Sequence, residues 1–152
     1  MGIIMKYTSR SAAETEEFGR RLGNALPEGS VIALFGDLGA GKTCFTRGFA
    51  SGMGIACDVY SPTFALVNEY RDGYKTLYHF DMYRISGFED LYSTGYFDYL
   101  DSGASLIIEW SENIESVLPD DCIRITISKS ESDESERILE IIGCDDLENT
   151  VC

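Results

Sequence analysis

The chain has 152 residues, and 26 acidic against 12 basic residues give it a formal net charge of −14. A chain of this length builds one hydrophobic core and has no room for a second catalytic domain, so we expect a single domain over residues 1–152. The negative charge repels phosphate backbones, which argues against nucleic acid as the direct partner and favours a basic surface on a partner protein.

The cysteines and the apolar segments give no sign of export or of membrane insertion. There are five cysteines, an odd number, and no C-x-x-C pair, so neither a disulfide framework nor a zinc site is indicated. No apolar run approaches the 18 residues that a spanning helix needs, and the N-terminus lacks the features of a signal peptide. We therefore expect a cytoplasmic protein without a membrane partner.

The first predicted element is an amphipathic helix over residues 11–26. Ser11 and Glu14 form a capping box, and apolar residues then recur on one face at Phe18, Leu22, Ala25 and Leu26. The helix ends near the Pro-Glu-Gly sequence at 27–29. On these grounds Ser11 is first a helix cap, and a contact with a nucleotide base is the alternative.

The most informative segment is residues 36–43, GDLGAGKT, which fits the phosphate-binding pattern G-x-x-x-x-G-K-[ST]. The apolar run 31–35 before it reads as a buried strand, and residues 44–50 after it have apolar side chains at helical spacing. Backbone N–H groups of such a loop and the helix dipole bind phosphate oxygens. We expect Lys42 to reach the β- and γ-phosphates and the Thr43 hydroxyl to bind Mg²⁺. The cradle itself would be formed by Asp37, Leu38, Gly39, Ala40 and Gly41. The alternative is a glycine-rich turn without a ligand.

The remaining elements predict an α/β protein. An extended run at 63–70, a turn at 71–74 and an alternating strand at 75–81 form a β-hairpin. Two short helical segments occupy 88–100, and a buried strand covers 104–110. Strands at 122–128 and 137–142 flank an acidic loop at 129–136, and a tail follows at 143–152. We predict a P-loop NTPase-like three-layer sandwich, whose mixed sheet has a parallel core and an antiparallel hairpin.

Two carboxylates stand where such a site needs them. Asp81 and Glu109 each end a predicted strand, at the sheet edge where α/β proteins bind ligands, but periodicity does not rank them, and either could be a surface carboxylate. The Asn-Lys-x-Asp element of guanine-specific proteins is absent, which favours ATP. His79, the single histidine, is interpreted as a residue of the core or of a hydrogen-bond network rather than as one acting near Asp81. Trp110 either belongs to the core or flanks the nucleotide or a partner.

Four motifs in order make the chain similar to the bacterial TsaE family of ATPases, also called YjeE, which takes part in making threonylcarbamoyladenosine on tRNA. They are GDLGAGKT at 36–43, SPTF at 61–64 followed by Leu66, Val67 and Tyr70, YHFDMYR at 78–84 and IIEW at 107–110. With Glu14 and Thr15 before them and Arg137 after them, the resemblance covers most of residues 8–142. The tail after about residue 143 matches no known pattern.

The resemblance implies roles for individual residues. Thr43 and Glu109 would bind Mg²⁺, Lys42 would bind phosphate, and Asp81 would act as the water-orienting or metal-linked acid. Thr63 would lie in a turn that senses the γ-phosphate. The family pattern also places Ser11 near the adenine and the Arg137 region close to the nucleotide. Trp110 is counted with them as a candidate nucleotide-binding residue.

The resemblance further implies partners and a mode of action. The protein would act with a complex of TsaB and TsaD and would meet tRNA only through that complex. We expect its ATP hydrolysis to be slow alone and stimulated by partners, because no arginine in the sequence has an evident claim to be an arginine finger. Two alternatives remain: a small-molecule kinase, which would need an acceptor pocket and a basic lid, and a module that binds nucleotide without hydrolysing it.

Overall fold

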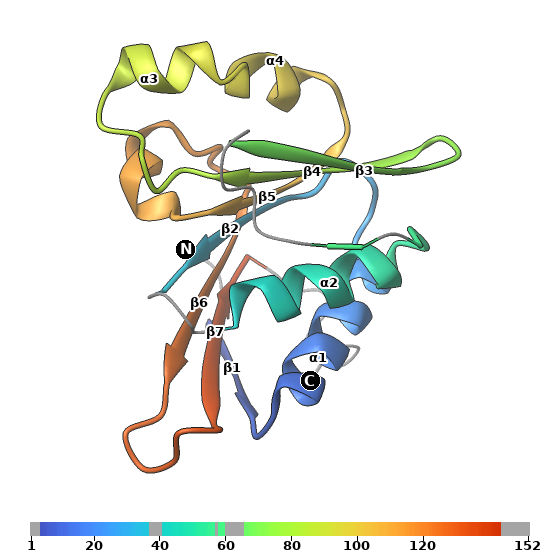
Figure 1. Cartoon of the computed structure of the whole chain (residues 1–152), viewed down its shortest axis with the longest axis vertical. Helices are drawn as coiled ribbons and strands as arrows, with labels where there is room; N and C mark the ends of the chain where they lie inside the picture. Colours follow the sequence, from blue (N-terminus) through green and yellow to red (C-terminus); the bar gives the residue numbers. More distant parts are fainter. Residues whose placement is uncertain (1–3, 37–40, 57, 60–65, 144–152) are drawn as a thin grey trace.

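In the computed structural model, seven strands form one sheet that has helices on both faces (Figure 1). The structure describes residues 4–36, 41–56, 58–59 and 66–143. The strand order is β1-β7-β6-β2-β5-β4-β3. The predicted α/β class and the three-layer arrangement with a mixed sheet are confirmed. No helix in the described part of the chain is long and apolar enough to cross a membrane.

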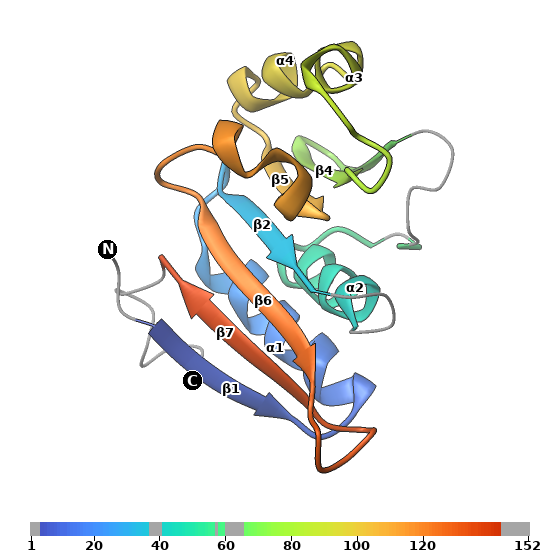
Figure 2. The ribbon, with the colours of Figure 1, turned by 90° about the vertical axis from the view of Figure 1, so that its left-hand side faces the viewer.

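The centre of the sheet is parallel and both of its flanks are antiparallel. Strands β2 (Val31–Phe35), β4 (Lys75–Asp81), β5 (Ser105–Glu109) and β6 (Ile123–Lys129) run parallel to one another. On one side, β3 (Val67–Asp72) forms a hairpin with β4. On the other side, β7 (Arg137–Ile142) pairs with β6, and β1 (Ile4–Ser9) pairs with β7 (Figure 2).

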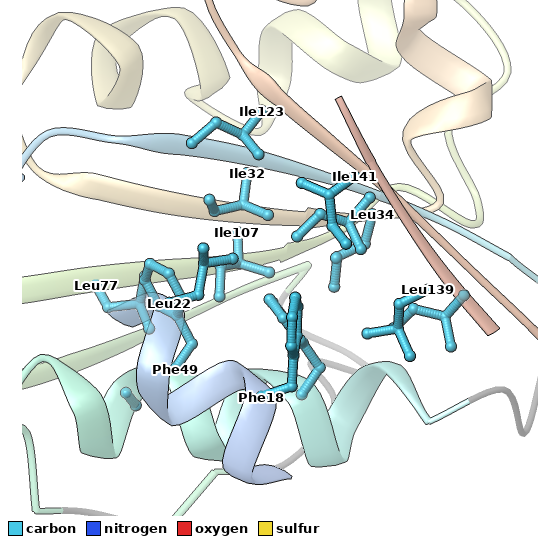
Figure 3. Packing of buried hydrophobic residues seen from close by; sticks show 14 of the residues in the cluster. Phe18, Leu22, Ile32, Leu34, Phe49, Leu77, Ile107, Ile123, Leu139 and Ile141 are labelled. Atoms are coloured by element: carbon cyan, nitrogen blue, oxygen red, sulfur yellow. The ribbon is translucent and has the colours of Figure 1, made fainter. Parts of the chain in front are cut away.

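Each face of the sheet has its own core because the strands of the parallel centre are apolar on both sides, as buried parallel strands are. Helices α1 (Ala12–Ala25) and α2 (Lys42–Gly52) cover one face. Their aromatic side chains, Phe18, Phe45 and Phe49, pack on isoleucines and leucines of the sheet (Figure 3). The short helices α3 (Phe88–Ser93), α4 (Tyr96–Asp101) and the 3₁₀ helix η1 (Ser111–Val117) cover the other face.

The predicted elements are all found, and several of their ends differ. The extended run expected at 63–70 enters the sheet only at Val67, because Leu66 has a left-handed φ of 64°; residues 63–65 lie outside the described part. The hairpin turn is shorter than the expected 71–74. Asp72 pairs with Lys75, and Gly73, with a φ of 64°, begins a two-residue loop, as glycine does in tight hairpins. Strand β1 and helix η1 were not predicted.

Helices α1 and α2 approach so closely that glycine is required on both of them. A Cβ atom built on Gly48 would lie 1.8 Å from the carbonyl oxygen of Glu16, and one on Gly52 would lie 2.0 Å from that of Arg20. Gly19 and Gly23 of α1 face the carbonyl oxygens of Phe45 and Phe49 in the same way, at 2.3 and 2.2 Å. Two G-x-x-x-G pairs, one on each helix, thus set the distance between α1 and α2.

Candidate functional site

The site is built around the N-terminus of α2, which β2 reaches through the loop at 36–41. Gly36 and Gly41, the described ends of this loop, have φ angles of 134° and 105°, values that side-chain-bearing residues seldom adopt. Gly41 is the N-cap of α2, and no acidic residue stands in the first turn of the helix. The positive end of the helix dipole is therefore not neutralised by a carboxylate of its own helix and suits an anionic ligand.

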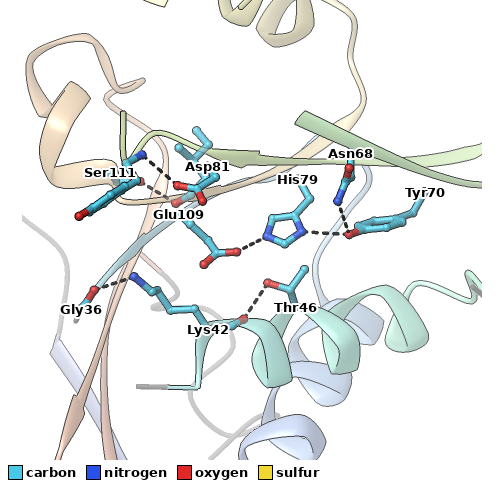
Figure 4. A network of polar contacts seen from close by, with 11 residues as sticks. Gly36, Lys42, Thr46, Asn68, Tyr70, His79, Asp81, Glu109 and Ser111 are labelled. Atoms are coloured by element: carbon cyan, nitrogen blue, oxygen red, sulfur yellow. Dashed lines mark hydrogen bonds and ion pairs between the residues drawn. The ribbon is translucent and has the colours of Figure 1, made fainter. Parts of the chain in front are cut away.

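Lys42 is held in a defined place although it is a long cation. Only 5% of the residue is exposed. Its Nζ atom donates a hydrogen bond to the carbonyl oxygen of Gly36 at 2.6 Å and lies 4.0 Å from the ring centroid of Trp110 (Figure 4). Trp110 reaches this place through a left-handed backbone, with a φ of 58°. A bulky residue with positive φ is rare and gathers at functional sites. Trp110 is thus partly buried against the core on the α3–α4 face of the sheet and also contacts Lys42.

The two candidate carboxylates stand side by side at the ends of neighbouring parallel strands. Asp81 of β4 and Glu109 of β5 are Cα partners in the register, so both side chains point to the face that α2 covers. Asp81 accepts a hydrogen bond from the backbone N–H of Tyr83 at 2.9 Å. Burial raises the pKa of Asp81, and the negative charge of Glu109 raises it further, against the lowering effect of the Tyr83 hydrogen bond and of the charges at His79 and Lys42.

A chain of buried polar groups ends at Glu109. The Nε2 atom of His79 contacts a carboxylate oxygen of Glu109, and its Nδ1 atom lies 3.1 Å from the hydroxyl of Tyr70. Asn68 donates from its side-chain amide to the same hydroxyl at 3.4 Å. His79 is fully buried, and Tyr70 and Glu109 are each 4% exposed. The interpretation of His79 as a buried hydrogen-bonding residue is confirmed, and its partner is Glu109 rather than Asp81.

The N-terminus of α1 lies beside the N-terminus of α2. The Ser11 hydroxyl accepts a hydrogen bond from the N–H of Glu14 at 3.1 Å, which confirms the predicted cap. Thr15, one turn along, bonds to Ser9 at 2.6 Å, and its methyl group would lie 3.7 Å from a Cβ atom on Gly41. Ser9 is in turn the β1 partner of Arg137 in β7, so these two residues lie side by side on neighbouring strands.

Not every predicted site residue falls within the described structure. Gly41, Lys42, Asp81, Glu109 and Trp110 are brought together around the N-terminus of α2, where Thr43 also lies. The guanidinium of Arg137 contacts the carbonyl oxygens of Glu134 and Glu136, at 2.5 and 3.0 Å, and so also holds the acidic loop. Outside the described residues lie Asp37, Leu38, Gly39, Ala40 and Thr63.

Two contributors to the site escaped prediction. Sequence patterns assigned Tyr70 no role beyond its place in a motif. The carboxylate of Glu112, in the unpredicted helix η1, accepts a hydrogen bond from the backbone N–H of Gly36 at 3.2 Å. The alternation of the hairpin strands could have placed Tyr70 and His79 near each other, because residues on facing strands share a face of the sheet. Nothing in the local sequence indicates the contact of Glu112.

The residues present fit a magnesium ion bound together with a nucleotide. Mg²⁺ takes one or two protein carboxylates and completes its shell with water and phosphate oxygens. Two adjacent partly or fully buried carboxylates, one of them with a raised pKa, are an arrangement that a divalent cation would stabilise. The described residues contain no cluster of three or more His, Cys, Asp or Glu side chains able to hold a metal ion by themselves, so the phosphates would have to share in the coordination.

Comparisons with known proteins agree on one family. Residues 9–139 match the model of "Threonylcarbamoyl adenosine biosynthesis protein TsaE". The chain is 42% identical over 123 residues to a protein of Treponema pallidum named tRNA threonylcarbamoyladenosine biosynthesis protein TsaE, covering 81% of the chain and 90% of that protein. A Bacillus subtilis protein of the same name is 39% identical over 140 residues, with 91% and 87% covered. The crystal structure of Bacillus subtilis YdiB superposes with a TM-score of 0.78 at 31% identity, covering 100% of the chain and 93% of that structure.

Proposed function

The chain belongs to the TsaE family of tRNA threonylcarbamoyladenosine biosynthesis, and on this premise we propose that it binds ATP with Mg²⁺ and hydrolyses it in support of that tRNA modification. The observation that carries the proposal is the meeting of three elements. The N-terminus of α2 presents Lys42, and Asp81 and Glu109 end the two neighbouring strands on the same face of the sheet.

Each residue has a role that its surroundings favour. Without ATP, the carbonyl oxygen of Gly36 and the ring of Trp110 hold the ammonium group of Lys42. When ATP arrives, Lys42 leaves both for phosphate oxygens. Thr43 and Glu109 hold Mg²⁺, which neutralises charge on the β- and γ-phosphates. Burial makes Asp81 a stronger proton acceptor than an ordinary aspartate, which suits a group that orients the attacking water.

Hydrolysis by the chain alone is slow in this proposal. Arg47 and Arg71 pair with Glu16 and Glu69, at 3.4 and 2.7 Å, on the protein surface. An arginine finger contributes about 10³–10⁵ in rate when present, so its supply by a partner would produce a large stimulation. We propose TsaB and TsaD as the partners, with tRNA met only through their complex and the reaction located in the cytoplasm.

Phosphate release from ATP tests the proposal. The purified chain with Mg²⁺ should release phosphate slowly, faster with TsaB and TsaD, and not at all when Lys42→Ala replaces it. Transfer of phosphate to an acceptor without release would indicate a kinase. ATP binding without release, even with both partners, would indicate a nucleotide-dependent binding module.

Two variants separate the roles of the carboxylates. Glu109→Ala should weaken ATP binding only when Mg²⁺ is present, because it removes a metal ligand. Asp81→Ala should bind Mg²⁺ and ATP as the unmodified protein does and release no phosphate. Loss of ATP binding in Asp81→Ala would show that the assignment of the two carboxylates is wrong.

A further inference from the structure

The Glu109 carboxylate is also the end of a buried chain of hydrogen bonds that passes through three neighbouring strands. Asn68 and Tyr70 come from β3, His79 from β4 and Glu109 from β5. Asn68 and His79 are Cα partners in the antiparallel register. Tyr70 is the Cα partner of Leu77, two residues before His79, and Glu109 is the partner of Asp81, two residues after it. The chain thus runs obliquely across the sheet, from β3 toward the end of β5 near Lys42 (Figure 4).

The direction of donation along this chain follows from its end groups. The side-chain amide nitrogen of Asn68 has only hydrogens to offer, so the hydroxyl oxygen of Tyr70 accepts there. The Tyr70 hydroxyl can then give its own proton to Nδ1 of His79. At the other end a carboxylate accepts, and a lone pair on Nε2 facing it would be repulsive. The proton that faces Glu109 therefore lies on Nε2.

An N–H donor at this place orients the carboxylate. His79 and Glu109 are both buried, so few other groups compete for this contact. The Nε2 atom of His79 engages one carboxylate oxygen of Glu109 and leaves the other oxygen for a metal ion. Partners of this kind commonly orient metal ligands.

We propose that His79 is the positioning residue of the magnesium site: with its ring held by the contact of Nδ1 with Tyr70, its Nε2 atom keeps the Glu109 carboxylate in the orientation that binds Mg²⁺. The inference rests on the proposed function, since Glu109 is the metal ligand there. His79 itself touches neither nucleotide nor metal in this arrangement. Its effect passes through Glu109 and is confined to the magnesium-dependent part of nucleotide binding.

The contacts of the imidazole ring can be followed directly because His79 is the only histidine in the chain. A protein labelled with ¹⁵N-histidine gives NMR signals from one imidazole. In Tyr70→Phe the Nδ1 signal should move, because the hydroxyl beside Nδ1 is lost. In the matched control Tyr78→Phe, whose ring lies on the other face of the sheet against Tyr99, the signal should stay. A Nδ1 signal that does not respond to Tyr70→Phe overturns the proposal that Tyr70 holds the ring.

Binding measurements test the positioning role. ATP affinity is measured for each variant with Mg²⁺ and with a chelator. The ratio of the first affinity to the second is the gain in ATP affinity due to Mg²⁺. In His79→Leu, which has no donor, this gain should fall roughly 10-fold or more, the usual effect of losing such a partner, while affinity in chelator stays the same. His79→Gln keeps an N–H donor at nearly the place of Nε2 and should recover most of the gain.

The outcomes distinguish this inference from the proposed function. An unmodified protein whose ATP affinity does not depend on Mg²⁺ contradicts the proposed function, and the positioning role is then refuted with it. An unmodified protein with a clear Mg²⁺ gain that His79→Leu retains in full refutes the positioning role alone. A melting curve shows whether His79→Leu is folded. If it is not, the test uses His79→Gln and the histidine NMR signals instead. A folded His79→Gln protein whose ATP affinity no longer increases with Mg²⁺ would refute the positioning role of an N–H donor.

Discussion

Replacing Gly48 by alanine should destabilise the protein although alanine is the better helix former. A Cβ atom at this position would lie 1.8 Å from the carbonyl oxygen of Glu16, 2.7 Å from its carbon and 3.0 Å from the amide nitrogen of Arg20. All three are backbone atoms of α1, so no side chain can rotate away. To bring the closest contact from 1.8 Å to 3.0 Å, α2 must move away from α1 by roughly 1.2 Å.

The magnitude follows from two opposing terms. Overpacking of a buried contact costs about 1–3 kcal/mol, and the upper end applies because the contact is with backbone. Alanine recovers about 1 kcal/mol through its helix propensity. The net loss is therefore about 2 kcal/mol in the free energy of unfolding, which corresponds to a decrease in Tm of about 4–8 °C for a domain of this size.

Thermal unfolding followed by circular dichroism measures the effect. Ser51→Ala is the matched control: Ser51 is exposed on the same helix, and this change carries the gain in propensity without the contact. It should leave Tm unchanged or raise it slightly. A Gly48→Ala protein that melts at or above the temperature of the unmodified chain would refute the reasoning, because α1 and α2 would then have room for the methyl group.

Three further outcomes follow from the site. Burial raises the pKa of Asp81, so the folded state binds its proton more tightly than the unfolded state does. The free energy of unfolding therefore falls as pH rises from the unfolded-state pKa of Asp81 through its folded-state pKa. Asp81→Asn should raise Tm at neutral pH without nucleotide, and the difference from the unmodified protein should vanish in acid. ATP with Mg²⁺ should change the fluorescence of Trp110, the only tryptophan, by drawing Lys42 from its ring, and Lys42→Ala should show no response. Gly36→Ala should lower the urea midpoint, because its Cβ would lie 2.2 Å from the carbonyl oxygen of Ile127 at a φ of 134°; an unchanged midpoint would contradict this.

Local sequence patterns predicted those features that depend on residues close together in the sequence. The cap at Ser11 is a contact over three residues, and the strand, loop and helix around Lys42 follow one another directly. Both signals are therefore complete within a short window. The positions of Asp81 and Glu109 at strand ends were also predicted, because each ends an apolar run.

What escaped prediction depends on partners far along the chain or on unusual backbone. Strand β1 has only one partner, β7, more than 120 residues later, and its short alternation is unremarkable alone. The contact between His79 and Glu109 requires β4 and β5 to be neighbours, which the sequence pattern does not establish. The left-handed conformations of Leu66 and Trp110 go against the preference of these residue types, so that no propensity could indicate them.

The pairing of β1 with β7 also determines when β1 can join the sheet while the chain is being synthesised. The residues of β1 leave the ribosome before those of the other described elements, yet the strand edge that they pair with is provided by residues 137–142. Helices α1 and α2 and strand β2 can associate from the first third of the chain, whereas β1 must wait until residues 137–142 have emerged. The edge of the sheet that carries Ser9 is thus completed last, and a nascent chain that already contains Lys42 still lacks that edge.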